Sequence, residues 1–441
     1  MRRSIHIAIL ILLVAASRAS AQDTARMEQV IQSYAAAGTF MGTVLVARDG
    51  APMLDKAYGM ANLELDVANT PDTKFRLGSL TKQFTAASIL LLEERGKLKL
   101  DDRLTTYVPD APPAWERITI FNLLTHTSGL PNFTAFSDYN TIKLSARTAS
   151  AAVAAVRGRD LDFGPGEKMS YSNTGYVVLG AIIEKVSGQS YEKFVTDNIF
   201  TPLGMKDSGY DSNTAIIKRR ASGYIKTPAG YLNGGYLHMS IPFSAGALYS
   251  TTRDLLKWEQ ALFGGKVLSK ASLDRMTTPF KNDYGLGLVS AVTNGRRVIW
   301  HNGGIDGFNT YMAFYPETRS VVIVLSNVNG PVPDQLGAQL GAIAHGDTVT
   351  LTTERREITV PAATLAKYIG DYALTPAITM TIAIDNGHLT AQLTGQGKNQ
   401  IFAQTETLFF LKAVDAQIEF AADAGSLVLH QNGRDMKATR R

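Results

Sequence analysis

The segment Phe75-Arg76-Leu77-Gly78-Ser79-Leu80-Thr81-Lys82 opens the most informative part of this 441-residue sequence. An apolar repeat of helical period follows it and ends near Gly96, so Ser79 and Lys82 lie one helical turn apart on one face. A serine needs a base to become a nucleophile, and an amine one turn away can serve. The glycine before Ser79 allows a close turn and access for a substrate. The segment therefore predicts a nucleophilic serine at the start of a helix.

The same four-residue pattern occurs a second time, at Ser190-Tyr191-Glu192-Lys193. This copy follows Gly188, a residue type that commonly ends helices. We interpret Ser190 as a helix N-cap and Lys193 as a solvated side chain. Ser79 and Lys82 are therefore the candidates for chemistry.

A second candidate motif is Tyr171-Ser172-Asn173, which directly precedes a predicted helix that ends near Val186. A tyrosine beside a cation is held as phenolate more readily and can act as a base. An asparagine can bind both the carbonyl and the amide of a substrate. The same spacing recurs at Tyr231-Leu232-Asn233, in a glycine-rich stretch that we interpret as a loop.

A third candidate motif is His301-Asn302-Gly303-Gly304, which follows the predicted strand Val298-Ile299-Trp300. A lone histidine on a strand is more often structural than catalytic. Glycines beside an active serine, however, admit a substrate backbone, and a backbone N–H there can complete an oxyanion hole. The seven histidines show no metal-ligand spacing, so we expect neither a metal nor a cofactor.

The distribution of strand-like and helix-like segments predicts the architecture. A hairpin is expected over 40–59, with a turn at Asp49-Gly50, and strands return at 310–315 and 321–325. Strands at both ends with helices between them predict an α/β sandwich with a helical insert, in which the two ends can meet in one sheet. This domain is expected to span residues 22–347.

The C-terminal part of the chain has a different pattern. A polar segment, 348–360, is predicted to be a linker, and short alternating runs follow over 361–441. Asn386-Gly387 and Asn432-Gly433 are strong hairpin turns. We expect a small all-β domain here, resembling a barrel.

Residues 1–21 have the features of a signal peptide: Arg2 and Arg3, the apolar core 7–16, and the cleavage pattern Ala19-Ser20-Ala21. The alternative is an uncleaved membrane anchor, but the apolar core is short for a bilayer span. We therefore expect a periplasmic or secreted protein with no stable membrane span after cleavage.

Composition excludes several classes of function. The formal charge is +5, and removal of the three arginines in the leader leaves +2, so we expect no nucleic-acid partner. The absence of cysteine excludes disulfides and thiol catalysis. The sequence also lacks the G-x-S-x-G elbow of α/β-hydrolases.

In their order along the chain, Ser79-x-x-Lys82, Tyr171-x-Asn173 and His301-x-Gly303 resemble the three motifs of serine β-lactamases and penicillin-binding proteins. The segments 97–102 and 123–130 also resemble this family. The resemblance covers about residues 25–345 and is nearest to the class C β-lactamase-related group, which includes esterases, D-amino-acid peptidases and transesterases. It implies an antiparallel sheet flanked by helices plus a helical subdomain. The tail resembles the lipocalin-like appendix of some members.

The resemblance also implies roles for the residues of the first two motifs. Ser79 would attack the substrate and form an acyl-enzyme. Lys82 would take or relay the serine proton and keep the site electropositive. Tyr171 would be the general base and later protonate the leaving group.

Binding roles carry over in the same way. Asn173 would hold the acyl chain of the substrate, and His301 and Gly303 would line the binding site. The backbone N–H groups of Ser79 and Gly304 would form the oxyanion hole. A histidine elsewhere in the family-like segments, His126, is expected to be structural.

One departure from the family bears on the substrate. Class C β-lactamases carry Lys-Thr-Gly where this chain has His301-Asn302-Gly303, and that lysine favours a substrate carboxylate. The histidine resembles the esterase and peptidase branches. We therefore expect a serine hydrolase of small esters or D-amino-acid and peptide-like amides. The alternatives are a β-lactamase or D-Ala-D-Ala carboxypeptidase, and a non-catalytic penicillin-recognising or cell-wall-binding protein. The sequence does not predict the oligomeric state.

Overall fold

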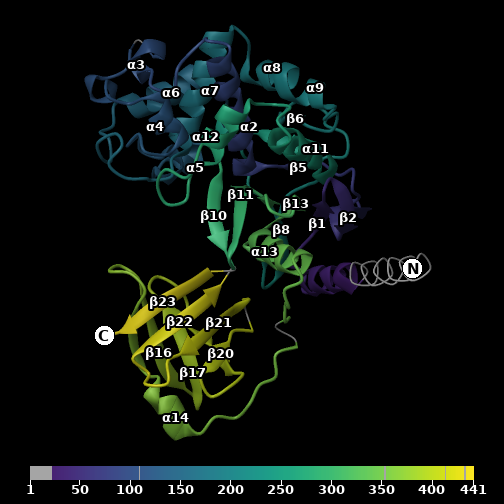
Figure 1. Cartoon of the computed structure of the whole chain (residues 1–441), viewed down its shortest axis with the longest axis vertical. Coiled ribbons are helices and arrows are strands. Elements are labelled where there is room, and N and C mark those ends of the chain that lie inside the picture. The colour runs from purple at the N-terminus through teal and green to yellow at the C-terminus, as the bar shows by residue number, and fades with distance from the viewer. Residues whose placement is uncertain (1–21, 109, 352–353, 413, 432–433) are drawn as a thin grey trace, which may run out of the picture. The chain divides into compact units, whose positions relative to one another are not determined.

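The computed structural model describes residues 22–108, 110–351, 354–412, 414–431 and 434–441 (Figure 1). The predicted signal peptide and the turn Asn432-Gly433 lie outside these ranges. The chain divides into two compact units, with the boundary between Ala344 and His345. Within the described ranges we find no helix with the length and apolar character needed to cross a bilayer.

The first unit is built on a six-stranded antiparallel sheet with the order β10-β11-β12-β13-β1-β2. The two ends of this unit meet in the sheet, because β1 pairs with β13. The pairing runs from Gly42 opposite Ser326 to Arg48 opposite Ser320. The strands are β1 (Gly42–Arg48), β2 (Ala51–Tyr58), β10 (Val289–Thr293), β11 (Arg296–Ile305), β12 (Phe308–Tyr315) and β13 (Ser320–Ser326).

Helices cover this sheet. Every residue of β13 is buried, as is all of β1 except Arg48, which matches their nearly continuous apolar sequences. Two helices, α11 (Thr252–Phe263) and α13 (Val332–Ala344), pack against these central strands. Residues 22–36 are also helical. The β1–β2 turn at Asp49-Gly50 has positive φ at both residues, as the sequence pattern predicts.

The chain between β2 and β10 forms a mostly helical region, which lies at the top in Figure 1. Its central helix, α2 (Thr81–Glu94), is buried over its first twelve residues and packs against α7 (Asn173–Ser187). Helix α7 is ended by Gly188, which has a φ of +70°. Neighbouring helices are α3 (Leu104–Tyr107), α4 (Ile120–Leu124), α5 (Tyr139–Ile142), α6 (Ala149–Arg157), α8 (Tyr191–Val195), α9 (Thr201–Leu203), α10 (Phe243–Gly246) and α12 (Lys270–Thr277).

Short strands complete the first unit. Of its three small sheets, two join segments that are distant in sequence, and the third, β3 with β4, is a local hairpin. Their strands are β3 (Met60–Asn62) with β4 (Val67–Ala68), β5 (Phe75–Arg76) with β9 (Leu248–Ser250) and β6 (Gly209–Tyr210), and β7 (Tyr224–Thr227) with β8 (Gly230–Asn233) and β14 (Val328–Asn329).

The second unit is a nine-stranded, nearly closed barrel-like sheet with the order β18-β17-β16-β15-β23-β22-β21-β20-β19. The two strands at the ends of this order are separated by a single residue in the chain, so the sheet curls to bring its edges together. The elements are α14 (Ala362–Lys367), β15 (Gly370–Ala373), β16 (Thr379–Asp385), β17 (His388–Leu393), β18 (Asn399–Gln400), β19 (Phe402–Ala403), β20 (Leu408–Phe410), β21 (Ala416–Phe420), β22 (Ser426–Gln431) and β23 (Arg434–Arg440).

The predicted architecture is confirmed: an α/β domain with an antiparallel sheet and helices, then a barrel-like β domain. Ser190 also caps α8 as expected, accepting a hydrogen bond from the Lys193 N–H at 3.2 Å. The loop interpretation of Tyr231-Leu232-Asn233 is wrong, because these residues form β8. The nearby glycines mark the ends of a hairpin there, and Tyr231 and Leu232 pair as an ordinary strand.

Candidate active site

Ser79 sits in a short 3-10 turn, η1 (Gly78–Leu80), where the chain enters α2. Gly78 has a φ of +54°, and a Cβ on this residue would stand 2.8 Å from the backbone nitrogen of Gly304. On the facing strand β11, a Cβ on Gly303 would collide with the Leu77 carbonyl oxygen. Glycine at both positions therefore lets the turn press directly against the strand. This brings Gly304 beside the serine, as the predicted oxyanion pair requires, although that role stays a prediction.

Lys82 is fully buried directly behind the serine. Its Nζ lies 3.0 Å from Ser79 Oγ, 2.8 Å from Asn173 Oδ1 and 2.9 Å from the Ala245 carbonyl oxygen. Burial lowers the pKa of Lys82 well below its usual value, which favours the neutral amine. Asn173 Oδ1 and the Ala245 carbonyl oxygen can only accept hydrogen bonds. A neutral amine can donate one N–H to each of them and turn its lone pair toward the serine hydroxyl. The geometry therefore suits removal of the serine proton.

Tyr171 approaches the serine from another side. Its hydroxyl donates to Ser79 Oγ at 2.7 Å, and its ring centroid lies 4.8 Å from Lys82 Nζ. Burial raises the pKa of Tyr171 above its usual value, so the neutral phenol is favoured. The sequence predicts the opposite shift, toward the phenolate, on the premise of a charged neighbour. Because burial also favours neutral Lys82, that charge is weakened, and the phenol is arranged as a proton donor.

Asn173, the first residue of α7, is held by a short turn on its far side. Its backbone N–H donates to Asn132 Oδ1 at 3.1 Å, and its Nδ2 donates to Thr134 Oγ1 at 3.3 Å. Its Oδ1 accepts from Lys82. These contacts fix the orientation of the amide, with Oδ1 toward the lysine and Nδ2 toward Thr134, where one N–H remains available for a substrate oxygen.

Behind Tyr171 lies a chain of buried hydrogen bonds that the sequence did not reveal. The Ser172 N–H donates to His126 Nδ1 at 3.1 Å, so His126 Nε2 carries the proton and donates to the Tyr284 hydroxyl at 3.2 Å. The Tyr284 hydroxyl donates to His301 Nε2 at 3.0 Å, and His301 Nδ1 donates to the Asn302 carbonyl at 2.6 Å. In this series of hydrogen bonds each donor thus meets an acceptor while both imidazoles stay neutral.

The electrostatics agree with this assignment. Burial lowers the pKa of His301 to about 4 and that of His126 well below its usual value. The His126 ring packs on the Tyr171 ring with centroids 4.3 Å apart, which supports its predicted structural role. His301 is 3% exposed and uses both ring nitrogens within the protein. Its predicted contact with substrate therefore stays a prediction, and the backbone of exposed Gly304 is the more accessible part of the motif.

Tyr284→Phe is expected to lower the free energy of unfolding by about 1–3 kcal/mol, because it leaves a nitrogen of each buried imidazole without a partner. Denaturant unfolding measures this loss. Tyr139→Phe is the matched control, since that hydroxyl forms no hydrogen bond with any residue that the structure describes, and it should change stability much less. Equal stability of the two variants would contradict the buried chain.

Comparisons with known proteins show the family of the chain. The beta-lactamase family matches residues 26–345, and a domain of unknown function (DUF3471) matches residues 354–437. The chain is 30% identical to penicillin-binding protein 4* of Bacillus subtilis over 437 residues, which covers 91% of this chain and 95% of that protein.

Solved structures give the same result. An octameric penicillin-binding protein homologue from Pyrococcus abyssi superimposes with a TM-score of 0.69 at 26% identity, covering 94% of this chain and 99% of that one. The D-amino acid amidase of Ochrobactrum anthropi, solved with L-phenylalanine amide, gives a TM-score of 0.62 at 29% identity, over 70% of this chain and 92% of that one. The family match and the full-length similarity together lead to one conclusion: this chain belongs to the beta-lactamase family, a serine-hydrolase superfamily that includes penicillin-binding-protein-like and D-amino-acid-amidase-like members.

Proposed function

We propose that this protein is a serine hydrolase that forms an acyl-enzyme at Ser79 and acts on small esters or D-amino-acid and peptide-like amides. One observation carries the proposal: Ser79 Oγ lies 3.0 Å from the buried amine of Lys82 and accepts a 2.7 Å hydrogen bond from Tyr171. A serine hydroxyl held between a desolvated base and a proton donor is the arrangement that nucleophilic catalysis needs.

Acylation follows from these contacts. Ser79 gives its proton to Lys82 as Oγ attacks the substrate carbonyl carbon, and the carbonyl oxygen becomes an oxyanion. The N–H groups of Ser79 and Gly304 would stabilise that oxyanion, each by about 3 kcal/mol. When the intermediate collapses, the Tyr171 hydroxyl protonates the departing oxygen or nitrogen, and the proton held by Lys82 restores the phenol. Asn173 Nδ2 is placed to bind the acyl part of the substrate.

Hydrolysis is completed when water attacks the ester of Ser79. The groups that activated the serine can now take a proton from that water, and Ser79 leaves with its own proton restored. Acylation and release thus use the same base, which takes a proton from the attacking hydroxyl, and the same donor, which protonates the leaving atom.

The third motif supports the choice of substrate class. His301 is neutral at pH 7, since burial brings its pKa to about 4. It therefore provides no positive charge at the place where class C β-lactamases have a lysine, which disfavours recognition of a β-lactam carboxylate there. Similarity to a D-amino acid amidase favours amides of this type. The leader peptide predicted from the sequence would place the reaction in the periplasm or outside the cell.

A penicillin-binding activity is a second candidate, favoured by the 30% identity to a penicillin-binding protein over nearly the whole chain. It needs the same acylation of Ser79 but slow release of the acyl group. The two candidates therefore share a nucleophile and differ in the lifetime of the acyl-enzyme.

Covalent labelling tests the nucleophile directly. Mature protein is treated with a fluorophosphonate and, separately, with benzylpenicillin, and its intact mass and peptide map are recorded. We expect one fluorophosphonate adduct, on the peptide that contains Ser79, and no persistent penicillin adduct. Ser190→Ala is the matched control, because Ser190 belongs to the second copy of the motif, and it should be labelled like the wild type. A lasting penicillin adduct would favour the second candidate, and no adduct with either reagent would favour a non-catalytic binding protein.

A further inference from the structure

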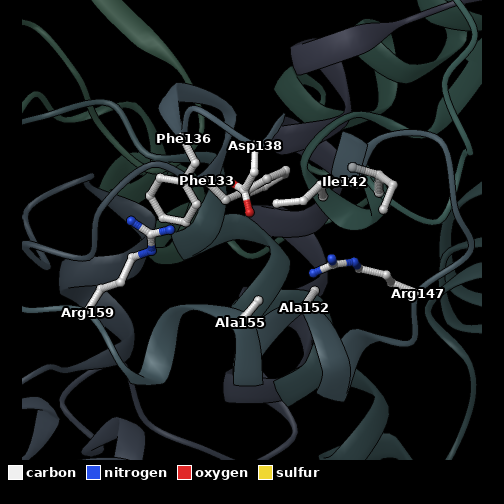
Figure 2. Close-up of a pocket in the computed structure, with 9 residues that line it drawn as sticks. Phe133, Phe136, Asp138, Ile142, Arg147, Ala152, Ala155 and Arg159 are labelled. Carbon is white, nitrogen blue, oxygen red and sulfur yellow. The ribbon is translucent and has the colours of Figure 1, made fainter. Parts of the chain in front are cut away.

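A cavity of about 140 Å³ opens in the helical region (Figure 2). Phe133, Phe136, Ile142 and Ile241 form its apolar wall. Its volume is close to that of a cavity that holds one molecule of benzene, about 150 Å³. The pocket therefore has room for a single ring or a short branched alkyl group.

The pocket adjoins the candidate active site through one short turn. Phe133 begins η3 (Phe133–Ala135), and Thr134 in the same turn accepts the hydrogen bond from Asn173 Nδ2. The Phe133 N–H donates to Thr174 Oγ1 at 3.1 Å. The turn that orients the acyl-binding amide thus also forms a wall of the pocket.

A second connection comes from strand β11. Ile305, the residue after Gly304, packs into the same apolar cluster as Phe133, Ile142 and Ile241. The Lys143–Asp306 ion pair, 2.8 Å, ties the residue after α5 to the end of this strand. These contacts connect the pocket to Asn173, which would hold the acyl part of a substrate.

Two cations reach this apolar pocket without an acidic partner. Figure 2 shows Arg147 on one side and Arg159 on the other, with Ala152 and Ala155 between them. The Arg159 guanidinium stacks on Phe136, 3.7 Å from the ring centroid. Within the part of the chain that the structure describes, neither guanidinium forms an ion pair or a side-chain hydrogen bond.

One acidic group, Asp138, also lines the pocket. With Arg147 and Arg159 it leaves a net charge of one positive unit among the lining residues. Stacking on an aromatic face leaves the edge of a guanidinium free to donate paired hydrogen bonds, a geometry that suits a carboxylate. The pocket therefore combines an apolar space the size of one ring with guanidinium groups that can donate hydrogen bonds to a carboxylate.

We propose that this pocket binds the acyl part of the substrate, and that the preferred acyl group is apolar, of about one ring, and ends in a carboxylate held by Arg147 and Arg159. The inference rests on the proposed acylation of Ser79 for its role in turnover, and it names the substrate more closely. It also moves recognition of a carboxylate from His301 to the two arginines of the pocket.

Two matched aryl esters test the proposal: p-nitrophenyl 4-carboxyphenylacetate and its neutral isostere, p-nitrophenyl 4-carbamoylphenylacetate. We expect wild-type kcat/KM to be higher for the carboxylate. Arg147→Gln or Arg159→Gln should lower the ratio of the two kcat/KM values by about 10-fold, since each removes a partly exposed charge-assisted contact. Asp138→Asn should raise the ratio, because it removes a repelling charge.

Arg157→Gln is the control, because Arg157 is the last residue of α6, the helix between Arg147 and Arg159, but pairs with Asp110 and does not line the pocket. It should leave the ratio unchanged. A wild-type ratio near one, or a ratio that neither arginine variant lowers, would overturn the proposal.

A binding measurement separates this inference from the proposed function. Calorimetry with 4-carboxyphenylacetic acid does not require Ser79 to react, and binding should weaken about 10-fold in Arg147→Gln. Binding without ester turnover or labelling would reject the hydrolase and keep the pocket. Turnover without this binding difference would keep the hydrolase and reject the pocket.

Discussion

Ser79→Ala is expected to reduce kcat/KM for a p-nitrophenyl ester by about 10⁴-fold or more, in line with the loss of a catalytic nucleophile in other serine hydrolases. Among the described residues, Ser79 Oγ is the one atom that both Lys82 Nζ and the Tyr171 hydroxyl approach within hydrogen-bond distance, so its removal leaves the base and the donor nothing to act on. Initial rates with the ester in large excess measure the loss. The residual rate reports what the oxyanion donors and binding alone provide.

The control uses the second copy of the motif. Ser190→Ala removes a helix cap and so costs about 1 kcal/mol of stability, but it should retain full activity. Thermal unfolding of Ser79→Ala should resemble that of the wild type, because the serine is only partly buried. Ester turnover that survives in Ser79→Ala at the wild-type rate would reject this serine as the nucleophile.

Lys82→Met is expected to reduce kcat/KM by about 10³-fold, because it removes the base while keeping an unbranched side chain in the buried site. Fluorophosphonate labelling of Ser79 should slow in parallel, which shows that the nucleophile itself has lost its activation. Lys193→Met, in the second copy of the motif, is the matched control and should leave both rates unchanged.

The pH dependence adds a readout that a structural role would not change. Acylation needs the neutral amine, so wild-type kcat/KM should fall about tenfold per pH unit below the pKa of Lys82, which burial has lowered. Activity should persist at alkaline pH, because burial raises the pKa of Tyr171 and keeps the phenol protonated. The acid limb should vanish in Lys82→Met. An unchanged acid limb in that variant would assign the titration to another group.

Local patterns predicted much of the fold because they are read over a few neighbouring residues. The hairpin over 40–59 appears as β1 and β2, and the helix before Gly188 appears as α7. The order of the three motifs was enough to indicate the family, and Ser79, Lys82, Tyr171 and Asn173 do converge. Each motif was informative because its spacing matches one turn of helix or one short loop.

Other features depend on residues that no local pattern connects. Tyr284 bridges His126 and His301 from a segment without any recognisable motif, so only the fold reveals it. The lowered pKa of Lys82 depends on burial, which a sequence does not state. The pocket beside Asn173 is likewise formed by distant segments, with Phe133 and Ile241 among its walls.

The pairing of β1 with β13 also has a consequence for how the chain folds. Strand β1 finds its partner only after residues 320–326 have been synthesised, and until then its apolar edge has one neighbour, β2. Such non-local pairing slows folding and exposes an aggregation-prone strand in the meantime. A nascent chain that stops before residue 320 should therefore bind chaperones and dissociate from them slowly. A chain that includes β13 should gain protease resistance abruptly, as a single cooperative event.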